Sequence, residues 1–135
     1  MSIHRIVLVD DNSIFCFIFE KLLEKYEKRD IELIRFDHGQ SALEYFQENR
    51  DVLEKSPSLV FVDINMPILN GWGLLDALVD CRHPLINTVP FFIVSSSDNN
   101  IDINKAKEYP FVKEYLNKPL DKKSLHSVLD QYLTI

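Results

Sequence analysis

The chain has 135 residues, of which 46% are hydrophobic and 27% charged, and its formal net charge is −6. This length fits one domain, and the composition is that of a folded globular protein, which excludes global disorder. The negative charge disfavours nonspecific binding to nucleic acid and to anionic membranes. No apolar run approaches the roughly 18 residues of a membrane span, and the first ten residues do not resemble a signal peptide. Cys16 and Cys81 stand alone and are expected to be reduced thiols, so we expect a cytoplasmic protein.

Short apolar runs predict the strands of a sheet. Residues 6–9, 59–62 and 91–94 form continuous apolar runs, which are typical of strands buried on both faces of a parallel sheet. Residues 31–36 form a weaker candidate, because polar residues interrupt the run. Residues 112–116 include two charged side chains and are expected to form an edge strand.

Helical periodicity fills the gaps between these runs. The first helix is predicted to bury an apolar stripe made of Ile14, Phe15, Ile18, Phe19, Leu22, Leu23 and Tyr26. Cys16 and Phe17 lie off this stripe. Ser41 and Glu44 resemble a capping box at the start of the second helix. Residues 99–109 are helix-like but poor in apolar residues, which predicts a shallowly docked helix.

The elements alternate between strand and helix five times along the chain. This order predicts an α/β fold with a doubly wound, five-stranded parallel sheet. Asn70 and Gly71 alone would suggest a hairpin turn, but a helical pattern follows them, so we interpret them as a loop that enters a helix. The last helical pattern, residues 125–133, runs to the end of the chain. We therefore expect a single domain over residues 1–135, without an output domain.

Polar residues end the predicted strands, at the edge where open α/β sheets bind ligands. They are Asp10, Asp11, Asp63, Ser95 and the segment Asn117 to Pro119. Clustered carboxylates repel one another, and a hard divalent cation such as Mg²⁺ relieves that repulsion. A lysine can hold a phosphoryl oxygen, and a carboxylate can act as the nucleophile of phosphoryl transfer. Each residue has an ordinary structural explanation by itself, but together they indicate a phosphoryl site.

Four motifs carry a resemblance to a known family. They are V-L-V-D-D-N ending at Asn12, V-D-I-N-M-P-I-L-N-G ending at Gly71, I-V-S-S ending at Ser96 and Y-L-N-K-P ending at Pro119. In order and spacing they resemble the signature of response-regulator receiver domains, over essentially the whole chain. The resemblance implies a flavodoxin-like, CheY-like sheet with strand order 2-1-3-4-5. It also implies a single-domain response regulator of a two-component phosphorelay.

The resemblance further implies a role for each acidic residue. Asp63 would accept a phosphoryl group from a histidine kinase or a histidine phosphotransfer protein. Asp10, Asp11, Asp63 and the backbone carbonyl of Asn65 would bind Mg²⁺. Lys118 would bind a phosphoryl oxygen. The protein would then act through a downstream protein target, without direct binding to DNA or to a membrane.

Ser95 and Tyr115 would form the switch. Ser95 would donate its hydroxyl to the phosphoryl group, and the ring of Tyr115 would follow that movement. The hydroxyl residue is more often threonine in this family, which leaves the strength of the coupling open. The peptide bond between Lys118 and Pro119 would be cis.

Two alternatives to a phosphorylation switch remain at this point. A phosphatase of the haloacid-dehalogenase type needs a second acid two residues after the nucleophile, and that position is Asn65. A scaffold that works without phosphorylation would not need the complete set of acids, hydroxyl and lysine. We therefore expect a signalling domain that assists its own phosphorylation and dephosphorylation, not a turnover enzyme. The four histidines, His4, His38, His83 and His126, are scattered and are expected at the surface.

Overall fold

A computed structural model describes residues 3–52 and 55–133. Five parallel strands form one sheet in the order β2-β1-β3-β4-β5, which confirms the predicted fold class and strand order. The strands are β1 (Ile3–Val9), β2 (Asp30–Phe36), β3 (Leu59–Val62), β4 (Phe91–Ser95) and β5 (Val112–Asn117). The two central strands next to the site, β3 and β4, are buried along their whole length, as continuous apolar runs predict. β5 lies at an edge, also as predicted.

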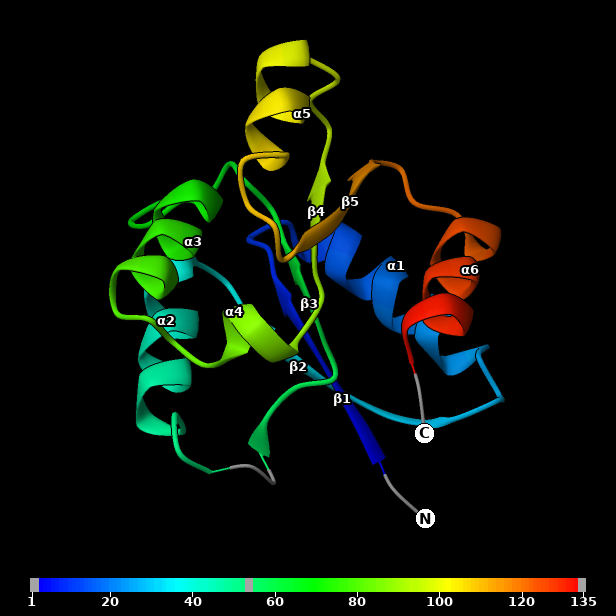
Figure 1. Ribbon diagram of the computed structural model, residues 1–135. Helices are drawn as coiled ribbons and strands as arrows, with labels where there is room; N and C mark the ends of the chain where they lie inside the picture. Colours follow the sequence, from blue (N-terminus) through cyan, green and yellow to red (C-terminus); the bar gives the residue numbers. More distant parts are fainter. Residues whose placement is uncertain (1–2, 53–54, 134–135) are drawn as a thin grey trace.

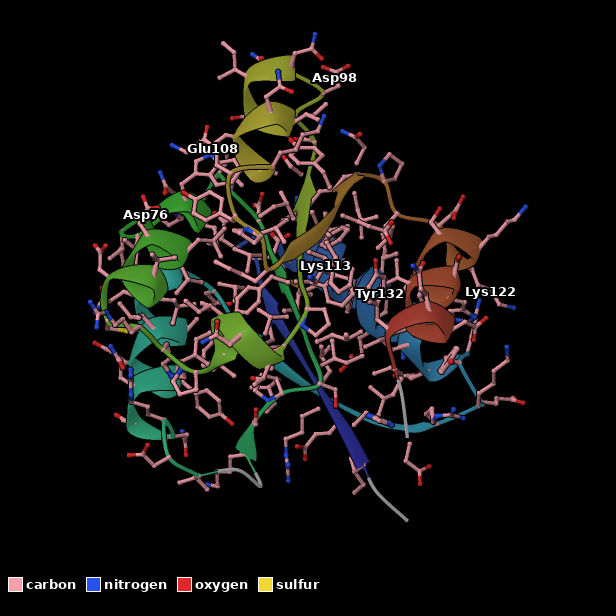
Figure 2. All side chains as sticks on the ribbon, viewed as in Figure 1. Asp76, Asp98, Glu108, Lys113, Lys122 and Tyr132 are labelled. Carbon is pink, nitrogen blue, oxygen red and sulfur yellow. The ribbon has the colours of Figure 1, made fainter. Side chains whose placement is uncertain are left out.

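Helices cover both faces of the sheet (Figure 1). They are α1 (Ser13–Glu24), α2 (Gly39–Glu48), α3 (Gly71–Asp80), the short α4 (Leu85–Thr88), α5 (Asn100–Ala106) and α6 (Lys122–Tyr132). α1 and α6 pack with one face of the sheet into one apolar cluster, and α2, α3 and α4 pack with the other face into a second. In the described part of the chain, no helix has both the length and the apolar character that a bilayer crossing requires. Charged side chains such as Asp76, Glu108 and Lys122 are exposed at the periphery (Figure 2).

The buried face of α1 differs from the predicted stripe. Phe15, Cys16, Phe19 and Leu23 are buried, whereas Ile14, Phe17 and Ile18 are 72%, 60% and 46% exposed. The prediction was therefore wrong for Ile14, Ile18 and Cys16. Apolar residues surround more than one side of this helix, so periodicity alone does not say which side faces the sheet. The side that is buried is the one that packs against the sheet, where the Phe19 ring lies 5.1 Å from the Phe61 ring between centroids.

Two further local predictions were wrong. α2 begins at Gly39, and its N-cap is His38, whose Nδ1 accepts a hydrogen bond from the Ser41 amide (3.2 Å). Ser41 therefore lies within the first turn and is not the cap. His83 is buried, and its two ring nitrogens are satisfied there by the Phe46 carbonyl (2.9 Å) and the Leu85 amide (3.1 Å). His4 is also buried, with Nδ1 3.0 Å from the Ser58 hydroxyl.

α5 is attached to the rest of the domain by few apolar contacts. Ala106 is the only residue of this seven-residue helix that is buried, and Ile101 is 75% exposed. The expected shallow docking of this segment is confirmed. α5 lies beyond the end of β4, at the top of the view in Figure 1.

Candidate functional site

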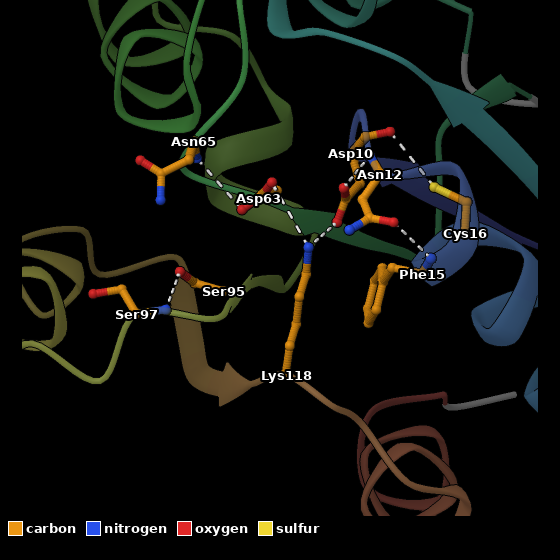
Figure 3. A network of polar contacts seen from close by, with 9 residues as sticks. All are labelled: Asp10, Asn12, Phe15, Cys16, Asp63, Asn65, Ser95, Ser97 and Lys118. Atoms are coloured by element: carbon orange, nitrogen blue, oxygen red, sulfur yellow. Dashed lines mark hydrogen bonds and ion pairs between the residues drawn. The ribbon is translucent and has the colours of Figure 1, made fainter.

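The carboxyl ends of the parallel strands bring together side chains that are far apart in the sequence (Figure 3). Asp10 follows β1, Asp63 follows β3, Ser95 ends β4 and Lys118 follows β5. Backbone hydrogen bonds continue the sheet past its formal end, from the Asp63 amide to the Val9 carbonyl (2.9 Å) and from the Lys118 amide to the Ser95 carbonyl (2.8 Å). The site residues are therefore held by the sheet itself.

Three carboxylates converge at this edge. One oxygen each of Asp10, Asp11 and Asp63 lies within 4.8 Å of the others. Asp10 is fully buried and Asp63 is 5% exposed, whereas Asp11 is exposed to solvent. The cluster is therefore open to solvent at Asp11, whereas Asp10 and Asp63 are shielded from solvent.

Lys118 is the cation of the site. Its Nζ lies 2.8 Å from Asp10 Oδ2 and 3.8 Å from Asp63 Oδ2, and its side chain is only 14% exposed. The ammonium also lies 4.4 Å from the centroid of the Phe15 ring, where the face of an aromatic ring attracts a cation. The peptide bond that joins Lys118 to Pro119 is cis.

The surroundings of Asp63 raise the pKa of its carboxyl group. Burial is the largest cause, and the Asp10 charge adds to it, so that the pKa of Asp63 rises from 3.8 to about 6. The Lys118 charge and a hydrogen bond from the Asn65 amide (3.4 Å) oppose this rise. One ammonium faces three carboxylates, so the site carries excess negative charge when all three are ionised.

The loop between β3 and α3 is packed too closely for a larger residue at Gly71. A Cβ atom at that position would lie 2.5 Å from the Asp63 carbonyl oxygen, so a side chain there would displace the Asp63 backbone. Ile68 adopts a φ of 70°, which is unusual for a β-branched residue, and its side chain is 78% exposed. Asn70 caps α3 by accepting a hydrogen bond from the Gly73 amide (2.8 Å). The predicted loop that enters a helix is confirmed.

Ser95 and Tyr115 meet through a third residue, Ser97. The Ser95 hydroxyl is fully buried and accepts a hydrogen bond from the Ser97 amide (3.0 Å). The Tyr115 hydroxyl donates to the Ser97 carbonyl (2.8 Å). Ser97 was not among the predicted site residues, because nothing in the sequence pattern distinguishes it from its exposed neighbour Ser96.

Comparison with known proteins identifies the family. The family model described as the response regulator receiver domain matches residues 6–130. The chain belongs to this family. Receiver domains are signalling domains, not classical enzymes, and the assignment agrees with a place in two-component signalling.

Relatives of this receiver occur both as short and as longer proteins. It is 26% identical over 129 residues to Protein PilH of Pseudomonas aeruginosa, which covers 96% of this chain and 97% of PilH. It spans only 12% of ARR13 of Arabidopsis thaliana, a protein named as a two-component response regulator, at 35% identity over 70 residues covering 52% of this chain. The crystal structure of a two component response regulator from Cytophaga hutchinsonii is similar at a TM-score of 0.85 and 28% identity, covering 98% of each chain.

The acidic cluster of the receiver fits a hard divalent cation. Carboxylate oxygens are the ligands that Mg²⁺ prefers, and three of them converge here. Asp10 Oδ2 is buried and forms an ion pair with the Lys118 ammonium. Within residues 3–52 and 55–133, it has no well-directed hydrogen-bond partner. The Asn65 amide donates a hydrogen bond to Asp63 Oδ1 (3.4 Å), so Asn65 lies beside the cluster. That its backbone carbonyl is a metal ligand stays a prediction. The donor set and its excess negative charge therefore suit Mg²⁺.

Proposed function

We propose that this receiver is a phosphorylation switch in which Asp63 accepts a phosphoryl group while Mg²⁺ is bound. The observation that carries the proposal is the position of Asp63, which is buried beside Asp10 and Asp11 and 3.8 Å from the Lys118 ammonium. The ligands of Mg²⁺ would be Asp10, Asp11, Asp63 and the Asn65 carbonyl. Bound Mg²⁺ would supply positive charge to the incoming phosphoryl oxygens.

The transfer itself needs one nucleophile and a good leaving group. An Asp63 carboxylate oxygen attacks the phosphorus, forms an acyl phosphate, and the bond from phosphorus to the donor breaks with its electron pair on the donor. With a pKa of about 6, Asp63 is mostly ionised at neutral pH and can act as this nucleophile. Lys118 then holds a phosphoryl oxygen by its charge, and the Ser95 hydroxyl donates a hydrogen bond to another.

The phosphoryl donor would be a histidine kinase or a histidine phosphotransfer protein, in the cytoplasm. Such a donor must approach the open side of the site, where Asp11 is followed by Asn12, the N-cap of α1. Ile14, Phe17 and Ile18 expose an apolar face on that helix, which suits contact with a protein better than contact with water. Residues 1–135 would form one receiver domain that acts on a downstream protein target, without binding DNA directly.

Phosphorylation by a small donor tests this function. Acetyl phosphate with Mg²⁺ should add one phosphoryl group to the wild-type chain, as seen by intact-mass analysis, and hydroxylamine should remove it because it cleaves acyl phosphates. Asp63→Asn should abolish the addition. Asp80→Asn, which changes an exposed aspartate at the far end of α3, should leave it intact. A label that persists in Asp63→Asn would overturn the assignment of the acceptor.

A further inference from the structure

The backbone of Ser97 connects β4 to β5 just beyond the acidic site. Its amide donates to the Ser95 hydroxyl (3.0 Å), as Figure 3 shows. Its carbonyl accepts hydrogen bonds from the Tyr115 hydroxyl (2.8 Å) and from the Asn117 side chain (2.9 Å). A movement of the Ser95 hydroxyl therefore acts on the same peptide segment that holds two side chains of β5.

The hydroxyl of Ser97 connects the same residue to α5. It donates to Asp102 Oδ2 (2.8 Å) and accepts a hydrogen bond from the Asn99 amide (3.3 Å). Asp102 lies in the first turn of α5, and Asn99 is the N-cap of that helix. A hydroxyl-to-carboxylate hydrogen bond is among the stronger hydrogen bonds in proteins, so Ser97 anchors the N-terminal end of α5.

The other end of α5 is held by different contacts. Tyr109 stacks on Trp72 of α3, with ring centroids 5.8 Å apart and planes 10° apart, and its hydroxyl donates to Asp76 (2.7 Å). Between the two ends, Ala106 is the only buried residue of the helix. α5 is thus fixed mainly at its ends, and loss of the Ser97 anchor frees the end nearest the acidic site.

We propose that Ser97 is the positioning residue that couples the Ser95 hydroxyl to the N-terminal end of α5. This inference rests on the proposed phosphorylation of Asp63. When the Ser95 hydroxyl turns toward a phosphoryl group on Asp63, the Ser97 amide loses its acceptor. The Ser97 peptide then moves, and the hydroxyl of the same residue moves away from Asp102. Phosphorylation therefore loosens α5 at its first turn while the Tyr109 end stays attached.

Amide hydrogen exchange of residues 99–109 tests the anchor without any phosphoryl group. Ser97→Ala should raise exchange in α5 about tenfold, the effect of losing a hydrogen bond to a charged group. Ser96→Ala, a matched change at the exposed neighbour, should have no effect, and Ser97→Thr, which keeps the hydroxyl, should stay close to wild type. Asp102→Ala removes the same bond from the other side, so Ser97→Ala combined with Asp102→Ala should exchange no faster than either single variant. Equal exchange in wild type, Ser97→Ala and Asp102→Ala would overturn the inference.

The same variants with beryllium fluoride and Mg²⁺ test the coupling. Wild type, Ser96→Ala and Ser97→Thr should show faster exchange in α5 when the phosphoryl mimic is added, and Ser97→Ala should lose most of that increase. An unchanged increase in Ser97→Ala would overturn the coupling role. Labelling of Asp63 by acetyl phosphate is measured in parallel and should not depend on Ser97. Failure of that labelling in wild type would refute the proposed function, whereas the exchange without the mimic would still decide whether Ser97 anchors α5.

Discussion

Asp63 lies in surroundings that oppose its own ionisation. Its pKa in the folded chain, about 6, is higher than the ordinary value of 3.8, mainly because it is buried and then because Asp10 is near. For a group whose pKa is raised by folding, the stabilising contribution is complete below the unfolded pKa and is lost as the pH rises through the folded pKa. As the pH rises from 3.8 to about 6, the metal-free protein therefore loses the contribution of Asp63 to its free energy of unfolding.

Replacing Asp63 by a neutral isostere removes this dependence. Without metal, Asp63→Asn should stabilise the fold relative to wild type by an amount that grows by on the order of 2 kcal/mol between about pH 4.5 and about pH 7.5. Urea unfolding in the presence of a chelator measures the difference at each pH. Asp80→Asn, at an exposed position on the far end of α3, serves as the control for the change of aspartate to asparagine. A difference that stays constant over this range would contradict the raised pKa.

Asp11 offers the cleanest test of the metal site, because it is exposed and its removal leaves no buried cavity. Mg²⁺ that binds only the folded state stabilises it by about 2.7 kcal/mol at a hundred times its Kd. Asp11→Ala should remove most of the resulting rise in melting temperature, whereas Asp80→Ala should keep it. A melting shift of wild-type size in Asp11→Ala would count against Asp11 as a ligand.

At the scale of elements, the segment from the end of β4 to β5 is the expected route of the switch. Ser95→Ala removes the hydroxyl that accepts a hydrogen bond from the Ser97 amide and that is proposed to turn toward a phosphoryl group on Asp63. It should still accept a phosphoryl group on Asp63, yet show a much smaller change in amide exchange across residues 99–116 when beryllium fluoride is added. Ser96→Ala should respond as wild type does. If Ser95→Ala responded fully, the hydroxyl would not be the coupling group.

The elements show which parts of the structure a single sequence can predict. Strands β3 and β4 are predictable because an uninterrupted apolar run has one physical explanation, burial on both faces of the sheet. The orientation of α1 was not predictable, because its apolar residues cover more than one side and the buried side depends on contacts that are distant in sequence, such as that of Phe19 with Phe61. The burial of His83 depends on two backbone partners, Phe46 and Leu85, and the first of these is distant in sequence.

At the scale of the whole molecule, the candidate site follows from the topology once the sheet is known. Asp10, Asp63 and Lys118 end or follow parallel strands, so the fold must bring them to one edge. Ser97 could not be found in this way, since its importance comes from partners on three elements and not from its own position in a motif. The family assignment supports the fold, and the roles of the individual residues stay predictions.

The two cysteines report on the integrity of the whole fold. Cys16 is buried, and burial raises the pKa of its thiol to about 11, whereas Cys81 is partly exposed. A thiol reagent at neutral pH should therefore modify Cys81 quickly in the native protein and Cys16 only when the domain opens. Peptide mass analysis over time separates the rates at which the two cysteines are modified, and Mg²⁺ should slow the modification of Cys16. Modification of Cys16 as fast as that of Cys81 would contradict its burial.

The stack of Trp72 on Tyr109 has an optical consequence. Trp72 is the only tryptophan of the chain, so all indole emission comes from one place, where α3 meets the end of α5. Lys105 of α5 lies over the same indole, 5.4 Å from its centroid, and a nearby charge shifts the emission wavelength of an indole. A displacement of α5 changes the ring contact, the charge and the solvent around this one fluorophore together. The unlabelled protein therefore reports the position of α5 through its intrinsic fluorescence, in real time and at low concentration.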